Sequence, residues 1–210
     1  MVQYNLEFTP LVPNVDLKGT VFIPTRSSTM VECFAIDWLI CNLKLERVGM
    51  FTCPSLVSPL VQLNAYTDDE SAALTTAVEL FANKGRDLFA IQIRSEILRK
   101  KQFATQIANF LSSLFEKIIL VSGSDSCYLS GEELEKPQIS WDCDYVVNGG
   151  ITKYLCRELS GKKLVVASTR GKGIGEIILV AKHMAKACAG EVGVCPETIA
   201  VPPPSVRLVV

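Results

Sequence analysis

Apolar residues recur along this chain in two patterns, one typical of helices and the other of buried strands. Thr29 and Glu32 form a capping box, and the apolar spacing behind it predicts a helix over about residues 30–43. A second stripe predicts a long amphipathic helix over residues 96–116, and it consists of Phe103, Ile107, Phe110, Leu111 and Leu114. Shorter helices are predicted over about residues 151–159 and 174–189.

The remaining apolar runs are short, as expected for strands. Residues 77–81 and 88–93 are separated by a connection short enough for an antiparallel hairpin. Residues 117–121 and 164–167 are uninterrupted apolar runs, typical of central strands that are covered on both faces. Two further strands are predicted at residues 19–24 and 48–51, after a polar, proline-punctuated leader that ends at Asp16.

The order of these elements predicts an α/β fold, namely a three-layer α/β/α sandwich with a mixed central sheet. A chain of 210 residues can close around one hydrophobic core. We expect a single domain over residues 1–190 and a flexible, proline-containing tail over residues 191–210, in which Pro202, Pro203 and Pro204 favour an extended conformation.

Composition narrows the class of function. Hydrophobic residues make up 49% of the chain and its net charge is -1, which describes a packed globule and gives no electrostatic sign of a nucleic-acid binder. One basic cluster, Arg99, Lys100 and Lys101, stands near the start of the long predicted helix. We interpret it as a solvated helix face.

The cysteines predict a reducing environment. The N-terminus lacks the pattern of a secretory signal, and no apolar run reaches the length of a membrane span, so an intracellular protein is expected. Eight cysteines lie dispersed in apolar segments, without C-x-x-C spacing and with one histidine in the whole chain. They are predicted to be reduced core residues, and no metal site is expected.

Three places along the chain carry residue types that can support chemistry. Gly171, Gly173 and Gly175 lie between a strand and a helix, where backbone N–H groups can bind phosphate, but their spacing fits neither nucleotide-binding pattern and favours a flexible loop. Ser122 follows a buried strand without G-x-S-x-G context, and His183 shares the outer face of its helix with lysines. No enzyme and no cofactor are therefore expected, with a nucleoside- or phosphate-handling enzyme of similar fold as the alternative.

One segment resembles a known family. Gly149, Gly150, Ile151, Thr152 and Lys153 are similar to the G-G-I-T-K segment of the proteasome assembly chaperone 2 family. The order of the surrounding elements is similar too, over about residues 19–189. The supporting segments are residues 22–24, 35–40, 48–51, 91–95 and 118–124.

The resemblance implies a chaperone that forms a heterodimer with proteasome assembly chaperone 1. Such a pair holds α subunits of the proteasome core while the α-ring forms, in the cytoplasm and secondarily in the nucleus. Some relatives insert a C-terminal hydrophobic-Tyr-any motif between α subunits. This chain ends in Leu208, Val209 and Val210, with Val209 in place of the tyrosine, so these residues are candidate contacts through their apolar character alone.

A second candidate contact lies in residues 55–63. A binder of this kind needs an exposed apolar patch, and this loop is more apolar than a solvated loop should be. The predicted contact residues are Leu56, Val57, Leu60 and Val61. The alternative is that the loop packs on the core of its own domain.

Overall fold

An eight-stranded mixed sheet organises the chain. The computed structural model describes residues 5–13, 16–26, 30–62, 75–124, 138–140, 150–160, 163–170 and 174–193. The strands of the large sheet run in the order β1-β3-β6-β7-β2-β8-β10-β9. They are β1 (Glu7–Pro10), β2 (Thr20–Pro24), β3 (Glu46–Thr52), β6 (Val78–Ala82), β7 (Leu88–Ile93), β8 (Lys117–Ser124), β9 (Gln138–Ser140) and β10 (Lys163–Arg170).

The centre of the sheet is parallel and its two sides are antiparallel. β2 pairs in parallel with both β7 and β8, and β8 pairs in parallel with β10. The hairpin of β6 and β7 is antiparallel, as predicted, and β3, β1 and β9 are antiparallel to their neighbours. A separate two-stranded sheet joins β4 (Val61–Gln62) to β5 (Thr75–Thr76).

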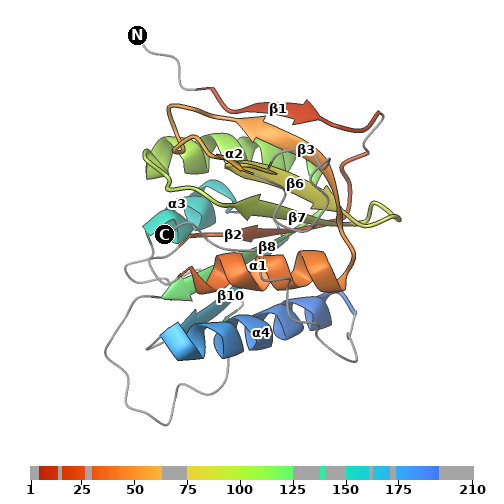
Figure 1. Ribbon diagram of the computed structural model, residues 1–210, viewed down its shortest axis with the longest axis vertical. Helices are drawn as coiled ribbons and strands as arrows, with labels where there is room; N and C mark the ends of the chain where they lie inside the picture. Colours follow the sequence, from red (N-terminus) through yellow and green to blue (C-terminus); the bar gives the residue numbers. More distant parts are fainter. Residues whose placement is uncertain are drawn as a thin grey trace.

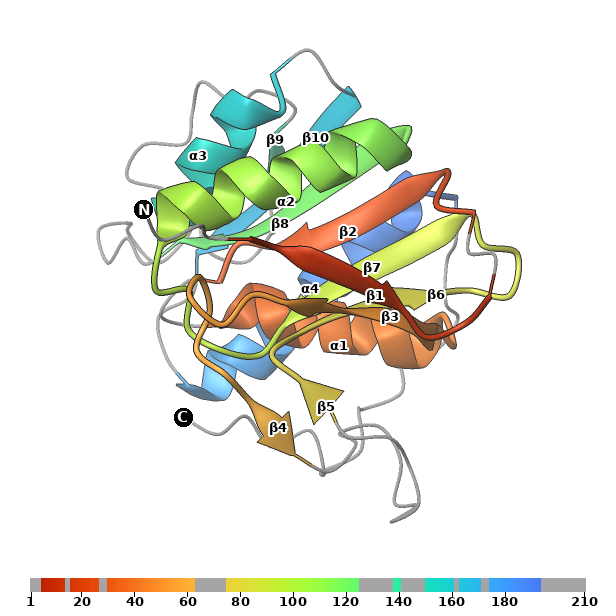
Figure 2. The ribbon, with the colours of Figure 1, turned by 90° about the horizontal axis from the view of Figure 1, so that it is seen from above.

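Helices cover both faces of the large sheet. α2 (Lys100–Leu114) and α3 (Gly150–Glu158) lie on one face, and α1 (Val31–Asn42) and α4 (Ile174–Glu191) lie on the other (Figures 1 and 2). Inward-facing residues alternate along each strand, so two apolar clusters form, one under each helix pair. This arrangement confirms the predicted three-layer sandwich with a mixed sheet.

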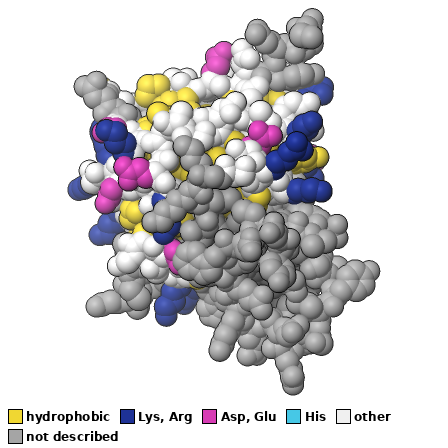
Figure 3. Space-filling model, turned by 180° about the vertical axis from the view of Figure 1, so that it is seen from behind, with side chains coloured by type: hydrophobic (Ala, Val, Ile, Leu, Met, Phe, Trp, Pro, Cys, Tyr) yellow, Lys and Arg dark blue, Asp and Glu magenta, His cyan; other side chains and the backbone are white. Residues whose placement is uncertain are grey.

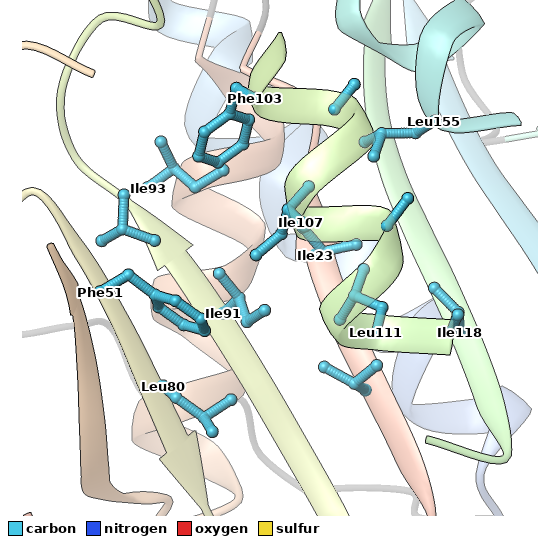
Figure 4. Packing of buried hydrophobic residues seen from close by; sticks show 14 of the residues in the cluster. Ile23, Phe51, Leu80, Ile91, Ile93, Phe103, Ile107, Leu111, Ile118 and Leu155 are labelled. Carbon is cyan, nitrogen blue, oxygen red and sulfur yellow. The ribbon is translucent and has the colours of Figure 1, made fainter. Parts of the chain in front are cut away.

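The cluster under α2 and α3 shows how helix and strand periodicities meet. Phe103, Ile107 and Leu111 of α2 point down onto Ile23, Ile91 and Ile118 of the strands (Figure 4). All six side chains are almost completely buried. Full burial of an aliphatic or aromatic side chain contributes about 1.5–3 kcal/mol, so this stripe supplies much of the stability of the layer.

α1 is buried on more than one side. Nine of its residues, all between Val31 and Ile40, are buried, because the helix packs against the sheet on one side and against α4 on the other. Trp38 marks the second contact, since the Lys182 ammonium of α4 lies 5.9 Å from the centre of its ring. The predicted bounds of this helix are confirmed, and Thr29 of the predicted capping box lies outside the described residues.

The prediction of a leader without structure up to Asp16 is wrong, because β1 forms the edge of the sheet there. Phe8 packs on Phe51 at 5.1 Å and on Phe110 at 5.2 Å between ring centres. Gly49 makes room for it, since a Cβ atom at this position would stand 2.3 Å from the Phe8 ring. Pro10 is tolerated because the outer side of an edge strand needs no backbone donor.

The long helix begins later than predicted. Residues 96–99 precede α2 in a non-helical connection, in which Ile97 forms an isolated β-bridge with Val57. β9 is a strand that the sequence pattern did not predict. None of the helices in the described part of the chain has the length and apolar character needed to cross a lipid bilayer.

Candidate partner-binding surfaces

The apolar loop that follows β3 is clasped to the segment before α2. The Ser58 N–H donates to the Glu96 carbonyl at 2.9 Å, and the Leu98 N–H donates to the Leu56 carbonyl at 2.8 Å. A turn inside the loop is closed by the Leu56 and Val57 N–H groups, which both donate to the Cys53 carbonyl. Two chain segments that are about forty residues apart therefore form one rigid unit.

Leu56 and Val57 anchor this unit from beneath. Their exposed fractions are 0% and 1%, and both belong to the cluster under α2. Leu56 and Val57 thus pack on the core of their own domain, as the alternative prediction has it. A side chain without exposed area has no surface to offer a partner, so any part they take in binding is to support the loop.

The outer surface of the unit is formed by other residues. Pro59 is exposed and Leu60 is half-buried, while the side chain of Val61 lies outside the described residues. Leu98 is exposed by 53%, more than any other large hydrophobic side chain in the described ranges. The sequence pattern placed Leu98 inside the long predicted helix, whereas α2 begins at Lys100 and leaves Leu98 in the connection before it.

The family-like segment opens α3. Gly150 is its first residue, Ile151 and Thr152 are buried, and Lys153 is exposed, while Gly149 lies outside the described residues. The Thr152 hydroxyl lies 2.9 Å from the Ser122 hydroxyl of β8. Thr25 directly follows β2, and its hydroxyl donates a hydrogen bond to the Ser122 hydroxyl at 3.2 Å.

These three buried hydroxyls tie the first turn of α3 to the carboxyl ends of two central strands. Their positions explain the threonine of the segment, because a buried hydroxyl needs a partner. They also give Ser122 a structural role, since its hydroxyl is held between two others. Gly171, Gly173 and residues 125–137 lie outside the described ranges, and so does the side chain of His183.

Replacing Thr152 with valine tests this tie. The change keeps the shape of the side chain but removes the hydroxyl, so we expect the free energy of unfolding to fall by about 1 kcal/mol. Thr152→Ser is the control, because it keeps the hydroxyl. It should lose less than Thr152→Val of the free energy of unfolding that the hydrogen bond contributes. Urea denaturation measures both variants, and equal stability of wild type and Thr152→Val would contradict the role of the tie.

A buried charge network joins α1 to the antiparallel side of the sheet. Asp37 of α1 accepts hydrogen bonds from Gln92 at 2.6 Å and from the Arg94 guanidinium at 3.1 Å. Arg94 also lies 3.8 Å from the Glu79 carboxylate, which accepts a hydrogen bond from Arg47 at 2.6 Å. Because cations and carboxylates alternate, the charges compensate one another, and the network holds α1, β6 and β7 in register.

Four thiols in the described part of the chain are poorly reactive because they are buried or partly buried. Burial raises the pKa of Cys33 well above its usual value, and it raises the pKa of Cys188 to about 12. The pKa of Cys41 and that of Cys53 are each raised to about 11, again mainly by burial. These thiols are therefore neutral at physiological pH, and a neutral thiol is neither a good nucleophile nor a metal ligand.

Within the described ranges no group of three histidine, cysteine, aspartate or glutamate side chains is placed to hold a metal ion. Of the cysteines predicted to be reduced core residues, Cys33, Cys53, Cys156 and Cys188 are buried and Cys41 is partly buried. Leu208, Val209 and Val210, the other predicted contacts, lie outside the described residues.

Several curated proteins have sequences similar to that of this chain. Proteasome assembly chaperone 2 of Bos taurus is 29% identical over 72% of this chain and 73% of its own length. Proteasome assembly chaperone 2 of Xenopus tropicalis is 34% identical over 58% of this chain and 48% of its own length. These relatives carry the name of a chaperone, in agreement with the prediction of a non-enzymatic protein.

Solved structures support the same fold. PbaA of Pyrococcus furiosus, described as an archaeal homologue of proteasome-assembly chaperone, has a TM-score of 0.67 at 14% identity, over 95% of this chain and 89% of that chain. The PAC2 family profile matches residues 22–187. Because this match spans most of the chain, the protein belongs to the PAC2 family, as a homologue of the proteasome assembly chaperones.

Proposed function

We propose that this chain forms a heterodimer with proteasome assembly chaperone 1 and holds proteasome α subunits while the α-ring assembles. The observation that carries the proposal is the family match over residues 22–187, together with curated relatives named proteasome assembly chaperone 2. The protein acts in the cytoplasm and secondarily in the nucleus, and it leaves the particle once assembly is complete.

The described structure supports a binding role rather than catalysis. Ionisable groups that converge inside the fold, such as Asp37, Arg94 and Glu79, compensate one another, and the buried thiols are neutral. A rigid frame of this kind suits a chaperone, because a preorganised surface loses little conformational entropy on binding.

Two places on the chain are proposed as contacts. The first is the loop around Leu60 and Val61, which Leu56 and Val57 support from the core. The second is the C-terminal Leu208, Val209 and Val210, whose apolar side chains add contact area without the tyrosine of the related tail motif. A variant without these three residues should retain heterodimer formation and bind α subunits more weakly.

Co-purification from cells tests the function. The tagged chain should recover proteasome assembly chaperone 1 and α subunits, with α subunits in excess over β subunits, when the partners are quantified by mass spectrometry. An excess of α subunits is expected because the chaperone acts before the particle is complete. Recovery of complete core particles only, or of no proteasome subunit, would contradict the proposal.

A further inference from the structure

The β4–β5 pair continues the apolar loop and is joined to the core through Glu79. The two strands pair antiparallel, Val61 with Thr76 and Gln62 with Thr75. Figure 2 shows this short pair apart from the large sheet. The Thr76 N–H donates at 3.0 Å to the Glu79 carboxylate, whose side chain is 1% exposed. A short two-stranded ribbon is therefore tied to a buried charge.

The tie at Thr76 is a charge-assisted hydrogen bond with a fixed acceptor. Glu79 Oε1 accepts from Thr76 and also from the Arg47 guanidinium, the latter at 2.6 Å. Arg94 Nε lies 3.8 Å from Oε2, the other oxygen of the same carboxylate. Hydrogen bonds to an ionised acceptor are roughly twice as strong as those between neutral groups. The base of the ribbon is thus fixed to the same network that holds α1 on the sheet.

The start of the apolar loop is fixed by a different contact. The Ser58 N–H donates to the Glu96 carbonyl at 2.9 Å. Only Pro59 and Leu60 lie between this hydrogen bond and the first residue of β4. Proline restricts its own backbone, because its ring fixes the φ angle. Leu60 is therefore carried on a two-residue bridge whose two ends are both held.

The back of the molecule has a different character. Figure 3 shows Lys and Arg side chains at the sides of the described surface there, and hydrophobic side chains in small separate patches. Among the described side chains, that face therefore offers no continuous apolar area of the kind that marks many protein-binding sites. The loop around Leu60 remains the apolar contact on which the two ties act.

We propose that Glu79 is a positioning residue for the contact that Leu60 makes with a proteasome α subunit. The inference rests on the proposed function and adds a residue that acts on this contact from inside the fold. Glu79 is buried and acts through Thr76 and β4. Without the tie, one end of the bridge is free to move in the unbound chain, and each residue that must be ordered on binding costs conformational entropy. Binding should then weaken although Leu60 itself is unchanged.

Matched carboxylate-to-amide changes separate positioning from stability. Glu79→Gln keeps the size of the side chain, but a neutral amide accepts more weakly from Thr76, and its NH2 group cannot accept from Arg94. Asp37→Asn makes the same change at the α1 end of the network, where Asp37 accepts from Gln92 and Arg94. The full chain, co-expressed with proteasome assembly chaperone 1, is titrated against each purified α subunit.

We expect Glu79→Gln to raise Kd at least fivefold and Asp37→Asn to raise it less than twofold. Both variants weaken the same buried network, but only Glu79 holds the Thr76 N–H. Equal changes of Kd in the two variants would overturn the inference, because they would report a loss of stability alone.

A double-mutant cycle shows whether Glu79 acts through Leu60. Leu60→Ser alone should raise Kd at least fivefold, because it removes the apolar contact. Adding Glu79→Gln to Leu60→Ser should then change Kd less than twofold, since the contact that Glu79 positions is already lost. A fivefold loss from Glu79→Gln in both backgrounds would give Glu79 a purely structural role and contradict the inference.

Amide hydrogen exchange of the wild-type chain tests the tie without a variant. The Thr76 N–H should exchange at least tenfold more slowly than the amide of Gly85, which is exposed in the turn between β6 and β7. Glu79→Gln should speed exchange at Thr76 and in β4 and change exchange in β7 much less. Equally fast exchange of Thr76 and Gly85 in the wild type would refute the tie.

The remaining outcomes separate the inference from the function beneath it. If the wild type binds α subunits and Leu60→Ser leaves Kd unchanged, the inference fails while the proposed function stands. If Leu60→Ser and Glu79→Gln release proteasome assembly chaperone 1 instead of the α subunit, the assigned partner is wrong. If the wild type binds no α subunit, the proposed function fails, and the inference fails with it.

Discussion

Replacing Arg94 with methionine should lower the free energy of unfolding by about 3–5 kcal/mol, the cost of removing one partner from a buried ion pair. Arg94 is the cation between Asp37 and Glu79, whose side chains are 0% and 1% exposed. Methionine retains most of the apolar stem of arginine, so the loss reports the charge rather than a cavity. Urea denaturation at neutral pH measures the difference.

Two further variants make the Arg94 experiment specific. Lys18→Met removes an ion pair with Asp16 in which both side chains are about 70% exposed, and it should change stability by less than about 0.5 kcal/mol. Adding Asp37→Asn and Glu79→Gln to Arg94→Met should recover part of the lost stability, because the buried negative charges are then removed as well. A loss below about 1 kcal/mol for Arg94→Met would contradict the structural role of the network.

The protein should also lose stability steeply between pH 9 and pH 11. An unfolded cysteine ionises near pH 8.5, whereas burial holds the pKa of Cys53 at about 11 and that of Cys188 at about 12. A thiol with a raised pKa in the folded state binds its proton more tightly than in the unfolded state. Its contribution is therefore complete below about pH 8.5 and is lost as the pH rises towards the folded pKa, at about 1.4 kcal/mol per pH unit for each thiol.

Cys188→Ala isolates one thiol from the other groups that ionise in this range. The variant should be less stable than wild type at pH 7, because Cys188 is fully buried between α4 and the sheet. The difference between the two proteins should then shrink by about 2.5 kcal/mol from pH 9 to pH 11, since the variant has one thiol fewer to ionise. Parallel declines of both proteins over this range would refute the explanation. Guanidinium unfolding curves at each pH provide the comparison.

Local patterns predicted the elements whose packing is itself local. The stripe of α2 and the hairpin of β6 and β7 followed from spacing alone, because periodicity and a short turn determine them. β1 escaped prediction because its stabilising contacts, from Phe8 to Phe51 and Phe110, join residues far apart in the sequence. Its four residues, Glu7–Pro10, carry a weak strand pattern of their own.

The surfaces were predicted less well than the fold. The apolar character of residues 55–63 was noticed, but it reflects two different environments, since Leu56 and Val57 are core residues while Pro59 is exposed. Leu98 and the buried network of Asp37, Glu79 and Arg94 depend on which segments meet in space. Sequence alone treats charged residues as solvated and a leucine near a helix as buried, so both features required the structure.

Sedimentation velocity of purified components measures directly whether this chain docks onto proteasome subunits. The chain with proteasome assembly chaperone 1 should sediment as a heterodimer, and addition of α subunits should produce a larger species that contains all three. Unchanged boundaries for every α subunit, at protein concentrations well above micromolar, would contradict the account.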